Sequence, residues 1–97
     1  MWYNIRAMKK AIITVVGKDT VGIIARTSAY LAKAGINILD ISQTVVQDYF
    51  NMMMIVDITG CRRSFEKLSA DLSEIGLGMG LEIRCQRSDI FERMHRV

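Results

Sequence analysis

The hydrophobic and polar positions of the chain fall into segments that have the period of a strand or of a helix. Residues 11–16 are rich in β-branched side chains, which favour a strand, and Gly17 is expected to end it. Apolar residues then recur at helical spacing as far as Gly35, which has the position of a left-handed C-terminal cap. The buried face of this helix is predicted to carry Val21, Ile24, Ala25, Ser28, Leu31 and Ala32.

Two further strands are predicted at residues 37–47 and 50–58, joined in a hairpin by Asp48 and Tyr49. The first strand alternates, which predicts one buried face with Leu39, Ile41 and Val45. The second strand is apolar on both faces, because Met53 and Ile55 lie opposite the side that carries Phe50, Met52, Met54, Val56 and Ile58. This pattern is typical of a strand that is covered on both sides.

A second helix is predicted after Ser64, which is a favourable N-cap residue. Its inner face is predicted to carry Phe65, Leu68, Leu72 and Ile75, and the glycines at 76, 78 and 80 are expected to break it. Residues 81–86 alternate as a fourth strand. Asp89 and Glu92 have the spacing of a capping box, which predicts a short C-terminal helix at residues 89–96.

This order of elements predicts an α+β fold of the ferredoxin-like βαββαβ type, with a four-stranded antiparallel sheet and two helices on one face. A single domain is expected over residues 8–97, with 88–97 as its C-terminal segment, after an N-terminal extension at residues 1–7. Because helices cover only one face of such a sheet, Met53 and Ile55 are predicted to form a dimer interface.

Composition and charge narrow the possible partners. The apolar fraction is 51%, with seven methionines in 97 residues, which favours a homodimer because a core of this size cannot hide so much apolar surface. The net charge of +3 arises from interleaved acids and bases, and only Phe50 supplies an aromatic ring on the third strand, so no nucleic-acid partner is expected. No apolar run is long enough to cross a membrane and no leader is evident, so a cytoplasmic protein without membrane contact is expected.

Catalytic chemistry is hard to assemble from these residues. His95 is the only histidine and lies near the end of the chain, and Ser28 and Ser42 have no histidine in their segments. Cys61 and Cys85 are separated by 24 residues and are expected to be reduced packing residues. The sequence therefore predicts no enzyme, no catalytic residue, no metal site and no cofactor.

The clearest motif is Gly-Lys-Asp-Thr-Val-Gly-Ile at residues 17–23, followed by Gly-Ile-Asn-Ile at residues 35–38. These segments resemble the ACT domain family, whose first loop carries Asp-x-x-Gly-[Ile/Val/Leu] and whose second strand opens with Asn-Ile. The resemblance covers residues 8–87. Together with residues 40–44 and 89–96, it is similar to the free-standing single-ACT proteins of bacteria and archaea.

The resemblance implies a small regulatory protein that binds an amino acid or a related small ligand at a homodimer interface. It implies a ligand site made of Asp19, Thr20, Val21, Gly22 and Ile23 on one subunit, with Asn37 and Ile38 from the other. The residues agree in kind, because Gly22 lets backbone amides approach a carboxylate while Asp19 and Asn37 suit an ammonium group. Two simpler interpretations remain open, namely that Asp19 is a helix cap and that Gly22 is a packing glycine.

A second hypothesis assigns the chain to a different functional class. The protein would be a ligand-independent interaction module that docks on a partner protein through the sheet face and the basic C-terminal segment.

Overall fold

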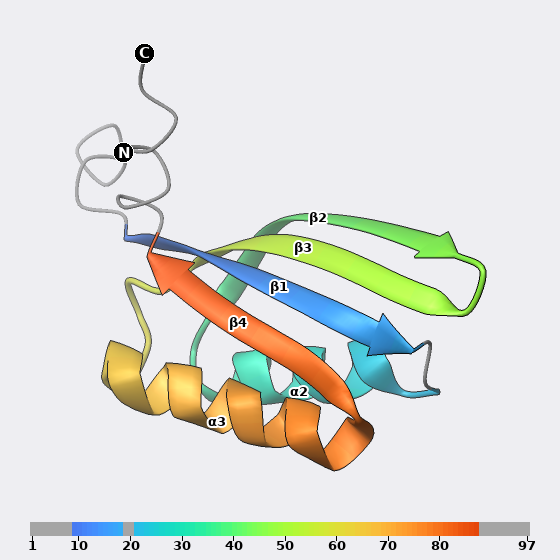
Figure 1. Cartoon of the computed structure of the whole chain (residues 1–97). Coiled ribbons are helices and arrows are strands. Elements are labelled where there is room, and N and C mark those ends of the chain that lie inside the picture. The colour runs from blue at the N-terminus through green and yellow to red at the C-terminus, as the bar shows by residue number, and fades with distance from the viewer. Residues whose placement is uncertain (1–8, 19–20, 88–97) are drawn as a thin grey trace.

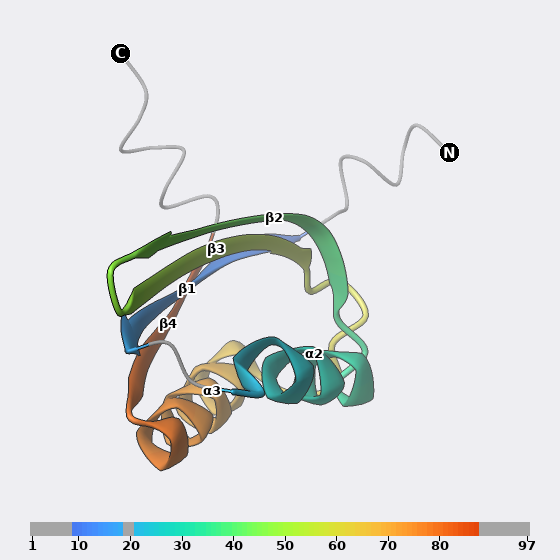
Figure 2. The ribbon, with the colours of Figure 1, turned by 90° about the vertical axis from the view of Figure 1, so that its right-hand side faces the viewer.

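The fold is a four-stranded antiparallel sheet with two helices on one face, as the sequence predicts (Figures 1 and 2). The structure is a computed structural model that describes residues 9–18 and 21–87. Its elements are β1 (Lys10–Lys18), α2 (Ile23–Lys33), β2 (Asn37–Val46), β3 (Tyr49–Asp57), α3 (Phe65–Met79) and β4 (Leu81–Arg87). The strand order is β2-β3-β1-β4, which leaves β2 and β4 at the edges. The predicted N-terminal extension and C-terminal helix lie outside the described residues.

The core lies between the sheet and the helices. Ile13 and Met54 are register partners on the central strands β1 and β3, and both are almost completely buried. From α3, Leu68 and Leu72 are buried against this face of the sheet. Each strand residue that faces the helices is followed by one that faces away, since side chains alternate along a strand.

Helix α2 buries a different stripe from the one predicted. Ile23, Thr27 and Leu31 are its buried residues, whereas Val21 precedes the helix and is fully exposed. The predicted positions Ile24, Ala25 and Ala32 are exposed, and Ser28 is half-buried. Thr27 was not part of the predicted stripe, and its hydroxyl donates a 2.8 Å hydrogen bond to the Ile23 carbonyl, which satisfies it inside the core.

Two strand boundaries also differ from the prediction. Gly17 does not end β1, which continues to Lys18 in pairing with Tyr49 of β3. The hairpin turns at Gln47 and Asp48, one residue earlier than predicted, and Gln47 adopts a φ of 56°. Both differences arise because strand pairing extends through positions whose local preferences favour a turn.

Strand β2 is more exposed than its alternating pattern predicts. Ile38 is half-buried, and the other nine of its ten residues are exposed. A register shift between Ile38 and Asp40 leaves Leu39 without a register partner on β3 and so interrupts the predicted alternation. Downstream, Ile41 and Val45 do share the helix side of the sheet with the buried residues of β3, but they remain 44% and 51% exposed at the sheet edge.

Helix α3 begins as predicted and runs further than predicted. Ser64 is the N-cap, and its hydroxyl accepts a 3.1 Å hydrogen bond from the Lys67 amide. Gly76 and Gly78 lie inside the helix, which ends at Gly80 with a φ of 72°. Gly76 is a close-packing residue, because a Cβ atom there would lie 2.7 Å from the Leu81 carbonyl oxygen of β4.

The face of the sheet that points away from the helices is called the open face here. Within residues 9–18 and 21–87, no helix or strand lies over it (Figure 2). Met53 and Ile55 belong to this face, as predicted, because their neighbours Met52, Met54 and Val56 are buried on the helix side. Met53 is 42% exposed and Ile55 is half-buried.

The two cysteines are free thiols packed against the core, as the sequence predicts. Burial raises the pKa of the Cys85 thiol to about 11, with a smaller contribution from Cys61. Neither of the two described helices has the length and apolar character that a membrane span requires.

Candidate functional site

The candidate site lies where β1 ends and α2 begins. Gly22 is the N-cap of α2 and adopts a left-handed conformation, with φ 89° and ψ 4°. Its carbonyl accepts the first helical hydrogen bond, at 2.9 Å from the Arg26 amide. A side chain at position 22 would meet no atom within 4 Å, so the backbone conformation and not packing calls for glycine.

This helix start has the electrostatic character of an anion site. Gly22 itself has no side chain that could cap the helix, and no acidic residue lies in the first turn. The amides of residues 23–25 precede the first helical hydrogen bond at Arg26, so they have no acceptor within the helix. Free amides and the positive end of the helix dipole together favour a bound carboxylate or another small anion.

The described residues of the predicted first loop differ in how exposed their side chains are. Asp19 and Thr20 lie outside the described residues. Val21 is 99% exposed, whereas the side chain of Ile23 is buried in the core. Ile23 therefore offers a ligand only its backbone amide, and Val21 is the one described side chain of this loop that is free to contact a ligand.

Asn37 and Ile38 do not lie near this loop within one chain. Lys18 at the end of β1 pairs with Tyr49, which pairs with Val46 of β2. Asn37 instead pairs with Asp57 at the other end of the sheet, so about 30 Å of strand separates it from Val46 at ~3.3 Å per residue. Asn37 is exposed, and Ile38 packs partly against the core.

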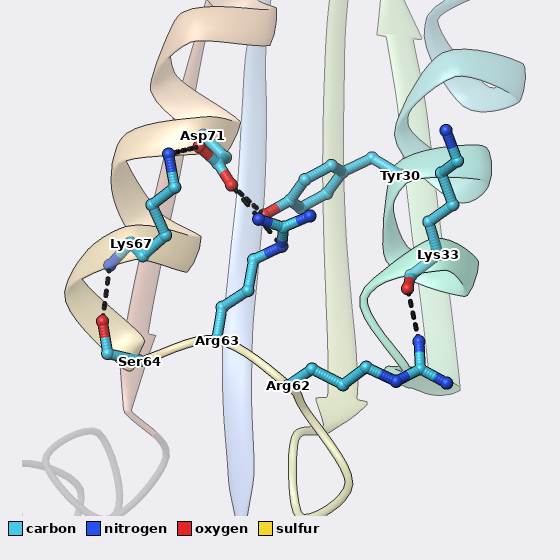
Figure 3. Close-up of polar contacts among 7 residues, drawn as sticks. All are labelled: Tyr30, Lys33, Arg62, Arg63, Ser64, Lys67 and Asp71. Carbon is cyan, nitrogen blue, oxygen red and sulfur yellow. Dashed lines mark hydrogen bonds and ion pairs between the residues drawn. The ribbon is translucent and has the colours of Figure 1, made fainter.

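A polar cluster that the sequence analysis missed joins the two helices (Figure 3). The Tyr30 hydroxyl of α2 donates a 2.6 Å hydrogen bond to the Asp71 carboxylate of α3, which also forms a 3.0 Å ion pair with Lys67. The Arg63 guanidinium lies 5.9 Å from the centre of the Tyr30 ring. Burial and the Asp71 hydrogen bond raise the pKa of Tyr30. The sequence held one sign of this contact: Tyr30 is an aromatic residue with a hydroxyl group beside the apolar stripe of its helix, where it can reach a neighbouring helix.

A shallow groove of about 590 Å³ lies between α3 and the end of β4. Its walls are formed by Phe65, Glu66, Ser69, Ala70, Ser73, Cys85, Gln86 and Arg87. Arg87 lies over the Phe65 ring at 4.9 Å. Because Arg87 pairs with Ala11, this groove is at the opposite end of the sheet from the loop between β1 and α2.

Comparison with known proteins identifies the family to which this fold and this motif belong. A family model described as "ACT domain" matches residues 9–86. The chain belongs to the ACT domain family. The ACT domain is a regulatory domain that binds small ligands, and its βαββαβ order is the one seen here.

Relatives of similar length occur in bacteria and archaea. A UPF0237 protein of Bifidobacterium longum is 54% identical over 90 residues, covering 93% of this chain and 100% of the relative. One from Methanocaldococcus jannaschii is 40% identical over the same shares. The solved structure of an ACT domain protein from Streptococcus pneumoniae is 44% identical, covers 87% of this chain and 94% of that chain, and superposes with a TM-score of 0.76. The resemblance to single-ACT proteins is therefore confirmed.

The described residues give no support for a metal site or for a catalytic pair of carboxylates. Residues 9–18 and 21–87 contain no group of three His, Cys, Asp or Glu side chains placed to hold a metal ion. Asp40 and Asp57, two acidic residues on neighbouring strands, are not register partners: Asp40 pairs with Ile55 and Asp57 with Asn37.

Proposed function

We propose that this ACT protein is a non-enzymatic regulatory module that binds an amino acid or a related small ligand between two copies of the chain. The observation that carries the proposal is the separation of the two halves of the motif. Residues 21–23, which follow the Lys18 end of β1, and the Asn37-Ile38 pair are at opposite ends of one sheet. A ligand of amino-acid size cannot touch both in one chain, so the second half must come from another copy.

The free edge of β2 offers the contact that would join the halves. β2 is an edge strand of ten residues that has no lysine, arginine or proline, and its exposed apolar side chains are Leu39, Ile41, Val45 and Val46. An edge with so little protection favours pairing with another strand. Antiparallel pairing of two β2 strands centred near Ser42 would place Asn37 of the second copy beside Gln47, at the end of the sheet where α2 begins.

Each end of an amino acid then has a matching group. The carboxylate would accept hydrogen bonds from the free amides at the start of α2, next to Gly22. The ammonium group would be bound by the side chain of Asn37 from the second copy or of Asp19. The fully exposed Val21 would contact the ligand side chain.

The first experiment is a thermal-shift screen of all twenty amino acids, followed by calorimetry on any that raise the melting temperature. A ligand that binds only the folded protein stabilises it by mass action. Asn37→Ala should weaken binding at least tenfold while changing the stability of the free protein by less than about 0.5 kcal/mol, since Asn37 is exposed. Asn51→Ala is the matched control, because Asn51 is an exposed strand asparagine outside the proposed site. Equal affinity in all three proteins would place the ligand elsewhere.

A mixing experiment tests whether two copies share one site. Asn37→Ala and Asp19→Ala should each bind poorly, because each removes one half of every site. When the two variants are unfolded together and refolded as an equal mixture, about a quarter of the sites should recover, since each mixed dimer has one intact site of two. No recovery would contradict a site that two copies share.

The second hypothesis is a ligand-independent module that docks on a partner protein through the sheet face and the C-terminal segment, and the 42% exposed Met53 on the open face supports it. It predicts that no amino acid raises the melting temperature, and that Asn37→Ala leaves every association of the protein unchanged. The thermal-shift screen and this variant therefore separate the two functions.

A further inference from the structure

The shallow groove between α3 and the end of β4 has the character of a docking surface for a short helix. Its α3 wall is the flank opposite to Asp71, the residue that binds Tyr30 of α2. Its other wall is the last three residues of β4, which runs antiparallel to α3 (Figure 1). Most of the groove surface is apolar, and only Glu66 and Arg87 among its lining residues are charged.

Leu77 extends the α3 wall beyond the groove. It lies four residues after Ser73, one turn further along the same flank of the helix, and it is 81% exposed. Phe65, Ser69, Ser73 and Leu77 are spaced four residues apart and form the α3 track, which is about 18 Å long at ~1.5 Å per residue. Small side chains between two apolar ends leave room for one face of a second helix.

Residues 88–97 follow the groove directly, and their sequence has the pattern that such a track receives. Ile90, Met94 and Val97 have the i, i+4, i+7 spacing of the anchors that a helix places in a groove. Phe91 lies beside them on the same helical face. The capping box predicted from the sequence would begin the helix at the required place.

The place where β4 ends selects this segment as the occupant of the groove. Arg87 lines the groove, lies 4.9 Å from the centre of the Phe65 ring, and immediately precedes the segment. A two-residue turn at 88–89 would therefore lead the chain back along the α3 track, and turns of this length commonly join a strand to a helix. So short a tether gives the segment an effective concentration of about millimolar, which favours it over any separate chain at lower concentration.

We propose that residues 88–97 fold back as a helix into the groove between α3 and β4 and bury their apolar face against the α3 track. Cys85 lies two residues before the end of β4, about 7 Å at ~3.3 Å per residue. Met94 lies five residues after Asp89, about 7.5 Å along a helix. Met94 is therefore expected beside Cys85, and the C-terminal segment is not free to dock on another protein unless it leaves the groove.

The test is disulfide formation between Cys85 and a cysteine introduced at position 94, with oxidised glutathione, in full-length protein that also carries Cys61→Ser. Met94→Cys should form this bond within one chain at least about tenfold faster than Arg96→Cys, because the rate follows the effective concentration of the two thiols. Arg96→Cys is the matched control, since residue 96 would lie on the opposite side of the helix from residue 94. Electrophoresis without reductant separates bonds within one chain from bonds between chains.

Equal rates in the two variants would overturn the proposal. A disulfide that forms only between chains at micromolar protein would also overturn it, because the occupant would then be the segment of another copy. If Cys61→Ser fails to fold, the rate of Cys85 labelling by a thiol reagent, located by mass spectrometry of peptides, repeats the test with both native cysteines present. Phe91→Gln should raise this rate and Arg96→Gln should not, and an unchanged rate in Phe91→Gln would contradict the docked segment.

Discussion

Gly22 shows how one residue sets both the start of a helix and the chemistry next to it. Its left-handed backbone begins α2 and leaves the amides of residues 23–25 without an acceptor in the helix. Gly22 occupies the N-cap position of α2. The site is therefore built from backbone conformation, which an L side chain at residue 22 would oppose.

Gly22→Ala should lower the free energy of unfolding by about 1 kcal/mol, because alanine adopts positive φ at a cost while the added methyl meets no atom within 4 Å. Urea denaturation at fixed chain concentration measures this change. Gly78→Ala is the control, since residue 78 lies within α3 and also faces open space. It should be neutral or stabilising by up to about 1 kcal/mol. Equal effects of both substitutions would contradict a special backbone role for Gly22.

Gly76→Ala should destabilise the protein by about 1–3 kcal/mol, although alanine favours a helix. The new Cβ would lie 2.7 Å from the Leu81 carbonyl oxygen and 3.0 Å from the Ile83 Cγ1 atom, so α3 would have to move away from β4. The same urea experiment and the same Gly78→Ala control apply. A stabilised Gly76→Ala protein would show that this helix-to-strand contact tolerates a wider spacing.

At the scale of elements, Tyr30 and Asp71 fix α2 against α3. Tyr30→Phe should lower the free energy of unfolding by about 1–2 kcal/mol, since it removes a hydrogen bond to a charged group without changing the ring. The Asp71 pKa should rise in this variant, and an NMR titration of the carboxylate measures it. Tyr49→Phe, at a 60% exposed tyrosine, is the control and should change neither quantity.

Asp71 also predicts a dependence of stability on pH. The hydrogen bond from Tyr30, then that from Lys67, holds the pKa of Asp71 below its ordinary value of 3.8. A carboxylate whose pKa is depressed in the folded state stabilises the fold fully above pH 3.8, and this stabilisation is lost as the pH falls through the folded-state pKa. Asp71→Asn should therefore be less stable than wild type at neutral pH, and the difference should shrink under acid. A constant difference across this range would contradict the coupling.

At the scale of the whole molecule, the charge distribution predicts weak and unspecific binding to nucleic acid. The net charge is only +3, and the open face carries charged residues of both signs. Fluorescence anisotropy with labelled RNA and DNA should show no submicromolar affinity at physiological salt, and the residual binding should disappear as salt rises. Tight binding to one sequence only would contradict an ACT regulatory role.

The sequence by itself determined the element order, the fold class and the family. These depend on local signals, such as the Ser64 cap and the alternation in β4, which agree with the tertiary structure. It also predicted that Met53 and Ile55 share the face without helices, because the period of two in a strand is independent of its surroundings.

Only the tertiary structure decided which side of α2 is buried, how exposed β2 is, and that Asn37 lies far from the loop between β1 and α2 in the same chain. Thr27 is buried because the Ile23 carbonyl satisfies its hydroxyl, and Gly76 stays helical because β4 packs against it. Burial, strand register and spatial separation arise from contacts between segments distant in sequence. The pattern of residues along the chain indicates the local structure that each residue prefers, but not which distant residue it contacts in the fold.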